Sequence, residues 1–151
     1  MKNVAVVQLR STMDVEANLE TIQGFTREAA RAGAHVVALP ENAAFLKTDP
    51  NATVPIQPLD GPIMSRFRDI AAESGVWLMV GSFAATGPDP DHYYNTTAVI
   101  DGTQSDAPIT ATYQKMHLFD IDIPGGEVQK ESAYIAPGSE LVCTPVAGIV
   151  T

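Results

Sequence analysis

Short apolar runs alternate with helical patterns through the first half of the chain. The runs at 4–9, 35–39 and 76–81 are rich in Val, Leu and Ala, which is typical of strands buried on both faces of a parallel sheet. Between them, apolar residues recur with the period of a helix from Asp14 to Gly33 and from Gly61 to Gly75. The strand-helix-strand order favours right-handed parallel βαβ units and therefore predicts an α/β fold.

The pattern changes in the second half of the chain. Residues 95–100 and 109–114 alternate in character and are separated by a turn, which predicts an antiparallel hairpin and hence a mixed sheet. From 116 to 140 there is no clear period, and a segment of that length inside a domain is usually functional or disordered. Residues 141–144 and 148–151 are then predicted to form two short strands around a turn.

Composition and charge narrow the class of protein. With 151 residues, 45% of them hydrophobic, the chain can form one domain with its own core. The formal charge of −9 disfavours nucleic acid and anionic membranes as partners, since both are bound mainly through Lys and Arg. No apolar run approaches a membrane span or a signal sequence. One cysteine suits a reducing compartment, so a cytoplasmic location is expected.

Two charged residues stand where strands of the predicted sheet end. Glu41 follows Leu39-Pro40, and Lys115 follows the strand at 109–114. Ligands of open α/β sheets gather beyond strand ends, and a buried ammonium is costly unless a carboxylate or a reacting oxyanion compensates it. The pair could act as general base and electrostatic stabiliser in acyl chemistry. A purely structural ion pair explains the pattern equally well.

The remaining candidates have a weaker chemical basis. Cys143 is the single thiol, but in Leu-Val-Cys-Thr-Pro it is typical of a small buried hydrophobe rather than of a nucleophile. His117, Asp120 and Asp122 lack a further His or Cys nearby, so no metal site and no cofactor are expected. Asn95, between tyrosines and threonines, is interpreted as a hydrogen-bonded structural residue.

Several motifs together resemble the nitrilase superfamily of carbon-nitrogen hydrolases, over essentially the whole chain. The matching pieces are Val4–Gln8, Val36–Asn42, Tyr94-Asn95-Thr96, the stretch around Lys115, Glu131-Ser132 and Pro137-Gly138. Lys-x-His-Leu-Phe-Asp from Lys115, followed by Ile-Pro-Gly, is most similar to the amidase branch that includes omega-amidase and deaminated glutathione amidase. The resemblance implies the N-terminal part of an αββα sandwich, with a mixed sheet and helices on one face.

The same resemblance implies roles for three residues. Glu41 would be the general base, Lys115 would stabilise the tetrahedral oxyanion, and Glu131 would be the additional glutamate that positions the site. The implied reaction is acylation of a cysteine by a small amide, with release of ammonia or an amine, and then hydrolysis of the thioester. Family members also assemble as dimers or larger oligomers, so a homo-oligomer is expected.

One part of the family pattern does not match this sequence. The nucleophilic cysteine belongs a few residues after the strand that begins at Gly148, and the sequence ends at Thr151. Cys143 precedes that strand and does not match the position. Residues 1–151 are therefore expected to be a single carbon-nitrogen hydrolase domain truncated before its nucleophile. The alternatives are an inactive truncated paralogue that acts as a binding or assembly module, and a complete small hydrolase that uses Cys143.

Overall fold

Each of the two α-helices begins and ends at a local signal in the sequence. In the computed structural model, which describes residues 1–126 and 128–150, α1 (Val15–Arg31) begins after Asp14, whose Oδ1 accepts a hydrogen bond from the Ala17 amide at 3.0 Å. α2 (Pro62–Ser74) begins with its proline and ends at Gly75, whose φ is 64°. Both predicted helices are confirmed. Within the described ranges, no helix has the length and apolar character that crossing a membrane requires.

Five strands form one mixed sheet, in the order in which they occur along the chain. β1 (Val4–Val6), β2 (Val36–Ala38) and β3 (Trp77–Asp89) are parallel, with α1 and α2 as their connections. β4 (His92–Asp101) and β5 (Ile109–Gln114) continue the sheet as antiparallel neighbours. The α/β class, the βαβ units and the hairpin of β4 and β5 are thus as predicted.

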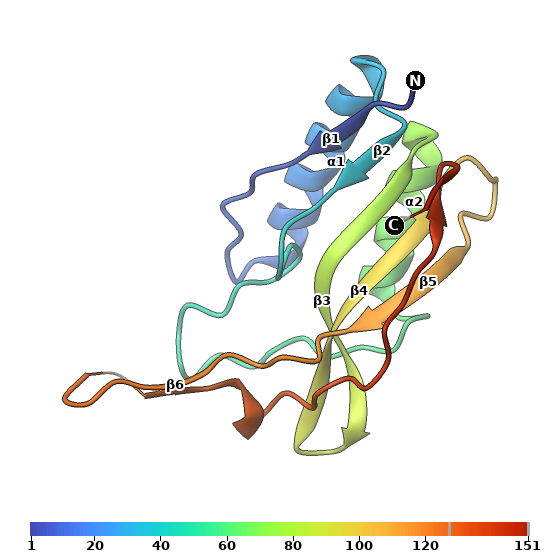
Figure 1. Cartoon of the computed structure of the whole chain (residues 1–151). Helices are drawn as coiled ribbons and strands as arrows, with labels where there is room; N and C mark the ends of the chain where they lie inside the picture. The colour runs from blue at the N-terminus through green and yellow to red at the C-terminus, as the bar shows by residue number, and fades with distance from the viewer. Residues whose placement is uncertain (127, 151) are drawn as a thin grey trace.

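Both helices pack on the same face of this sheet (Figure 1). The apolar faces of the two helices bury large side chains that are at most 1% exposed. Each fully buried Leu, Ile or Phe side chain contributes roughly 1.5–3 kcal/mol to the stability of the fold. The main members of this core are Leu19 and Ile22 of α1, Met64, Phe67 and Ile70 of α2, and Val37, Leu78, Val80, Ala98 and Ile100 of the sheet. The helices therefore fix the sheet from one side only.

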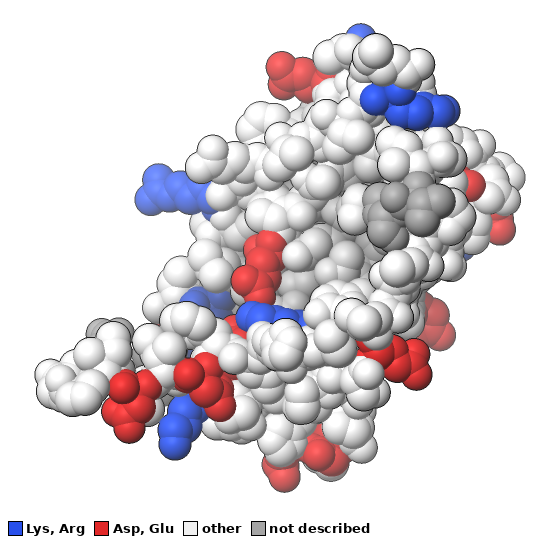
Figure 2. Space-filling view, viewed as in Figure 1, with Lys and Arg blue, Asp and Glu red and all other residues white. Residues whose placement is uncertain are grey.

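The opposite face of the sheet is only partly covered. A small cluster of Val36, Val99 and Val146 is buried there, where the C-terminal segment crosses the sheet (Figure 1), and Figure 2 shows mostly uncharged surface on this side. Val4 and Val6 are 55% and 83% exposed. The prediction that the first strand is buried on both faces is wrong, because β1 is an edge strand and its second face is not covered by any helix of the described residues.

β3 is longer than the predicted strand at 76–81. It continues to Asp89 and forms a long hairpin with β4, with a shift in pairing register between Val80 and Phe83. This irregularity places Gly81 and Ser82 out of step with the partner strand and interrupts the apolar run. The sequence pattern ends at the bulge, although the strand continues past it.

The C-terminal part of the chain contains short elements, and its last pair of strands is shorter than predicted. β6 (Asp120–Asp122) pairs with β7 (Val128–Lys130), and the 3-10 helix η1 (Glu131–Ala133) follows directly. β8 (Pro145–Val146) pairs with β9 (Ile149–Val150).

The predicted strand at 141–144 is wrong. Leu141 is 85% exposed, and pairing starts only at Pro145, because the tight turn at Ala147-Gly148 brings only two residues on each side into register. The strand predicted at 148–151 corresponds to β9, and its last residue, Thr151, lies outside the described residues.

We expect the uncovered sheet face to drive self-association of this chain, because exposed apolar strand surface favours contact with a second copy. Replacing Val6 by Lys should weaken association by about tenfold or more, since a buried Val is worth roughly 1.5 kcal/mol or above. Sedimentation velocity over a range of concentrations measures this. Phe25→Lys is the matched control, because Phe25 is 43% exposed and lies on α1. A monomeric wild-type chain that melts cooperatively at every concentration would contradict the prediction.

Candidate functional site

Glu41 lies in a tight loop directly after β2, and Ser82 holds this loop on both sides. The Ser82 amide donates to the Pro40 carbonyl at 3.1 Å, and the Ala43 amide donates to the Ser82 carbonyl at 3.2 Å. Between them, Asn42 adopts a φ of 54°, a left-handed conformation that Asn tolerates better than most residues. The bulged part of β3 therefore fixes the backbone that carries Glu41.

Gly81 allows β3 to approach this loop closely. A Cβ at position 81 would lie 2.4 Å from the carbonyl oxygen of Leu39, well inside the normal contact distance between carbon and oxygen. Any side chain at position 81 would therefore push β3 away from the end of β2, just before Glu41. The glycine is thus a requirement of the site's scaffold.

Lys115 follows β5 and is held at its backbone from two directions. Its amide donates to the Asn95 carbonyl on β4, and its carbonyl accepts from the Gly138 amide, both at 2.9 Å. This pairing places Lys115 next to Asn95 at the end of the antiparallel hairpin. The Lys115 side chain is 25% exposed, so most of it is removed from water.

The Lys115 ammonium lies between two carboxylates. Its Nζ is 3.1 Å from Oε1 of Glu41 and 2.9 Å from Oε2 of Glu131. Glu41 also accepts a hydrogen bond from Nδ2 of Asn95 at 2.7 Å, and Glu131 accepts one from the Phe119 amide at 2.7 Å. The structure therefore brings together all three predicted site residues, which come from separate segments of the chain.

The two carboxylates determine the charge state of Lys115. Burial by itself lowers the pKa of Lys115, but its hydrogen bonds to Glu131 and Glu41 outweigh this effect, and the pKa lies above its ordinary value. Lys115 is consequently a cation at neutral pH. A fixed positive charge at this position can stabilise an anion that forms beside it.

Glu131 is held in place by its neighbours in η1. The Ser132 amide donates to Oδ1 of Asp120 at 3.0 Å, and the Ser132 hydroxyl donates to Oδ2 at 2.5 Å. These bonds from Ser132 lower the pKa of the Asp120 carboxyl below its ordinary value. The pairing of β6 with β7 joins the same two segments. The segment after Lys115 and the one that carries Glu131 are therefore clamped together beside the ion cluster.

A cavity of about 740 Å³ opens beside the ion cluster, within the size range of small-molecule sites. Asn95 and Glu131 line it, together with apolar residues of the loop at 42–56. Its other wall includes Tyr93 and Tyr134, whose rings stack with centroids 6.0 Å apart. Burial raises the pKa of Tyr93 to about 12, with Tyr134, Glu131 and Glu41 adding to the effect. Both phenols are thus neutral groups in the wall of a cavity that has both polar and apolar residues in its lining.

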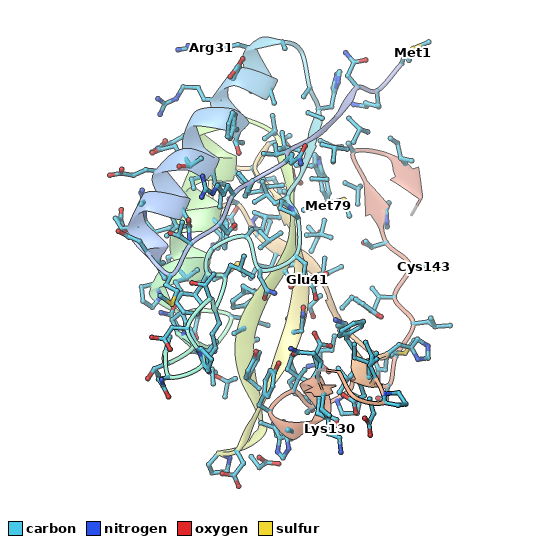
Figure 3. All side chains as sticks on the ribbon, turned by 90° about the vertical axis from the view of Figure 1, so that its left-hand side faces the viewer. Met1, Arg31, Glu41, Met79, Lys130 and Cys143 are labelled. Carbon is cyan, nitrogen blue, oxygen red and sulfur yellow. The ribbon has the colours of Figure 1, made fainter. Side chains whose placement is uncertain are left out.

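The other sequence candidates lie outside this cluster. Cys143 is exposed rather than buried as predicted, and Figure 3 shows it on the C-terminal segment, apart from Glu41. His117, Asp120 and Asp122 do not form a metal-binding group, and no set of three His, Cys, Asp or Glu suited to a metal is found in residues 1–126 and 128–150.

Asn95 is hydrogen-bonded, as the sequence interpretation expects, and the structure shows that its partner is Glu41. Strand alternation relative to Lys115 could have indicated it, because the ends of β4 and β5 are paired.

Replacing Gly81 by Ala should destabilise the chain by about 1–3 kcal/mol, the usual cost of inserting a methyl group into a tightly packed position. Urea unfolding measures this change. Gly24→Ala is the matched control, because Gly24 lies in α1 with nothing within 4 Å of an added Cβ, and we expect it to stabilise the chain by about 0.5–1 kcal/mol. Equal effects of the two substitutions would show that the close contact with Leu39 is unimportant.

Replacing Glu131 by Gln should lower the pKa of Lys115, because the ammonium loses a charged acceptor. NMR titration of the Lys115 side chain measures the shift. Since the pKa is raised in the folded chain, the stabilisation is present at neutral pH and is lost as the pH rises through that pKa. We expect the variant to lose about 1–3 kcal/mol at neutral pH. Glu73→Gln, which breaks an exposed ion pair with Arg27, should leave the pKa of Lys115 unchanged. An unchanged pKa in Glu131→Gln would contradict the role given to this contact.

Comparisons with known proteins identify the family to which this chain belongs. The sequence pattern of the carbon-nitrogen hydrolase family matches residues 3–150. Deaminated glutathione amidase of Bos taurus is 37% identical over 153 residues, which cover 97% of this chain and 46% of that protein. The nitrilase and fragile histidine triad fusion protein NitFhit of Caenorhabditis elegans is 31% identical over 141 residues, covering 92% of this chain and 31% of that protein. The chain thus spans less than half the length of these relatives.

Solved structures show the same fold. The Caenorhabditis elegans NitFhit protein superposes with a TM-score of 0.74 at 30% identity, over 97% of this chain and 36% of that one. An amidase from Nesterenkonia sp. has a TM-score of 0.74 at 22% identity, over 99% of this chain and 53% of that one, which is a likeness of fold alone. The predicted nitrilase-type fold is confirmed, and the chain belongs to the carbon-nitrogen hydrolase family.

Proposed function

We propose that residues 1–151 supply the N-terminal half of an amidase that hydrolyses the carbon-nitrogen bond of small linear amides. The observation that carries this proposal is the partly buried Lys115, whose ammonium is held between Glu41 and Glu131, beside a ligand-sized cavity that Glu131 lines. The amidase names of relatives such as the Bos taurus protein support the choice of an amide substrate. A homo-oligomer is part of the proposal, since the uncovered sheet face favours association.

In this proposal each residue of the cluster has a separate task. Glu41 takes the proton of a cysteine thiol while the sulfur attacks the amide carbon. The electron pair of the carbonyl moves onto its oxygen, and Lys115 stabilises the resulting oxyanion. The carbon-nitrogen bond then breaks, the proton passes from Glu41 to the nitrogen, and ammonia or an amine leaves. Glu131 keeps Lys115 in place through its two short contacts.

The thioester is then hydrolysed by water at the same site. Glu41 takes a proton from the water molecule as its oxygen attacks the thioester carbon. The carbon-sulfur bond breaks, the sulfur recovers the proton, and a carboxylic acid is released. The same base thus serves both halves of the reaction.

The nucleophile is proposed to lie on a segment that follows Thr151. Cys143 does not suit the role, since it is exposed and lies on the C-terminal segment, apart from Glu41 (Figure 3). The share of each relative that this chain covers, 46% for the Bos taurus protein, agrees with a site completed by a further segment.

The test measures ammonia release from a panel of short ω-amides by two longer proteins, each of which extends this chain with a C-terminal segment. One is the product of the coding frame read past Thr151, where that frame encodes a cysteine in a strand-turn-helix pattern. The other joins residues 1–150 to the remaining C-terminal segment of the Bos taurus relative. We expect turnover, with Glu41→Gln and Lys115→Met each lowering kcat/KM by about 10²- to 10³-fold.

Cys143→Ser is the matched control and should leave turnover unchanged. Turnover by the 151-residue chain alone, abolished by Cys143→Ser, would overturn the placement of the nucleophile. Amide binding without turnover in every form would favour a binding or assembly module instead.

A further inference from the structure

The two oxygens of the Glu41 carboxylate have different surroundings. Nδ2 of Asn95 donates to Oε1 at 2.7 Å, and Nζ of Lys115 donates to the same oxygen at 3.1 Å. In the part of the chain that the structure describes, every hydrogen bond to this side chain ends on Oε1. A carboxylate oxygen offers about two acceptor directions, so Oε1 is fully engaged while Oε2 keeps its lone pairs.

Asn95 is built rigidly into the sheet. It is 5% exposed and lies in β4, where its carbonyl accepts the hydrogen bond from the Lys115 amide. The same residue therefore positions the backbone of Lys115 and the side chain of Glu41. Because its amide is neutral, it fixes the carboxylate without adding a second positive charge next to Lys115.

Glu41 needs such a support. Its side chain is half exposed, and its other donor is the ammonium at the end of a long lysine side chain. An ammonium is a point charge that can bind either carboxylate oxygen equally well. Lys115 alone would therefore leave the carboxylate free to rotate, whereas the amide of Asn95 contacts one oxygen from a fixed direction.

We propose that Asn95 is a positioning residue that engages Oε1 of Glu41 and leaves Oε2 as the oxygen that accepts the proton. This inference rests on the proposed function, in which Glu41 is the general base. In the first step, the thiol S–H bond breaks and an O–H bond forms at Oε2. The sulfur keeps the electron pair and bonds to the amide carbon. Oε1 remains hydrogen-bonded to Asn95 and Lys115 throughout.

The first arm of the test needs no turnover. The 151-residue chain, labelled with ¹³C at the glutamate side-chain carboxyl, is compared by NMR with its Asn95→Ala and Asn95→Asp variants at neutral pH. Asn95→Asp keeps the shape of the side chain but removes the donor. We expect the Glu41 carboxyl signal to move in both variants. An unmoved signal would overturn the proposal.

Asp101→Ala is the matched control. Asp101 is also buried in β4, at 6% exposed, and its hydrogen bonds go to Thr103 and Gln104 rather than to Glu41. This variant should lose comparable stability and leave the Glu41 signal in place. If it moves the Glu41 signal as much as Asn95→Ala does, the effect of Asn95 is a general loosening of β4 and the proposal is wrong.

The second arm uses whichever longer form releases ammonia. We expect Asn95→Ala to lower kcat by about tenfold to a hundredfold, part of the 10²–10⁴ that a general base supplies, with KM within about twofold of wild type. Asp101→Ala should change neither constant at a temperature where it is folded. A raised KM with unchanged kcat would make Asn95 a substrate-binding residue and overturn the proposal. If no form has activity, the proposed function fails, while the NMR arm still decides whether Asn95 positions Glu41.

Discussion

The partial burial of one charged lysine side chain is the constraint around which the site is built. Three-quarters of the Lys115 side chain is removed from water, and such a charge is tolerated only where carboxylates or other acceptors replace the lost hydration. Glu41 and Glu131, 74 and 16 positions away, meet this requirement together. The loop after β2, the end of β5 and η1 are thus held at one point by a single cation.

The part of the fold that local signals specify could be predicted from the sequence. Asp14 and Gly75 mark helix ends through their own side chain or backbone conformation, so the helices were found at their observed places. The exposure of Val4 and Val6 could not be predicted, because it depends on what covers the second face of the sheet. The length of β3 was missed at Gly81, since a bulge interrupts the apolar pattern without ending the strand.

The site residues that directly follow a strand could be predicted from the sequence pattern, and the others could not. Glu41 and Lys115 follow strands directly, and the chemistry of a charged group at such a position was sufficient to single them out. Glu131 has no such signal and was found only through resemblance to a family. The bond from Asn95 to Glu41 joins residues 54 positions apart, and it depends on the register of β4 against β5. Alternation along the two strands limits the possible registers, but the contact with Glu41 also depends on the path of the loop after β2, which has no periodic pattern.

The uncovered sheet face and the ion cluster belong to the same side of the molecule. Side chains alternate along β4, so Asn95 points to the same face as Val99, which packs with Val36 and Val146. A segment or subunit that covers that apolar surface would therefore lie on the same side of the sheet as Glu41. In the proposed amidase, one covering element could then both bury the apolar strand surface and reduce the access of bulk water to the base. Completion of the core and completion of the site would depend on the same contact.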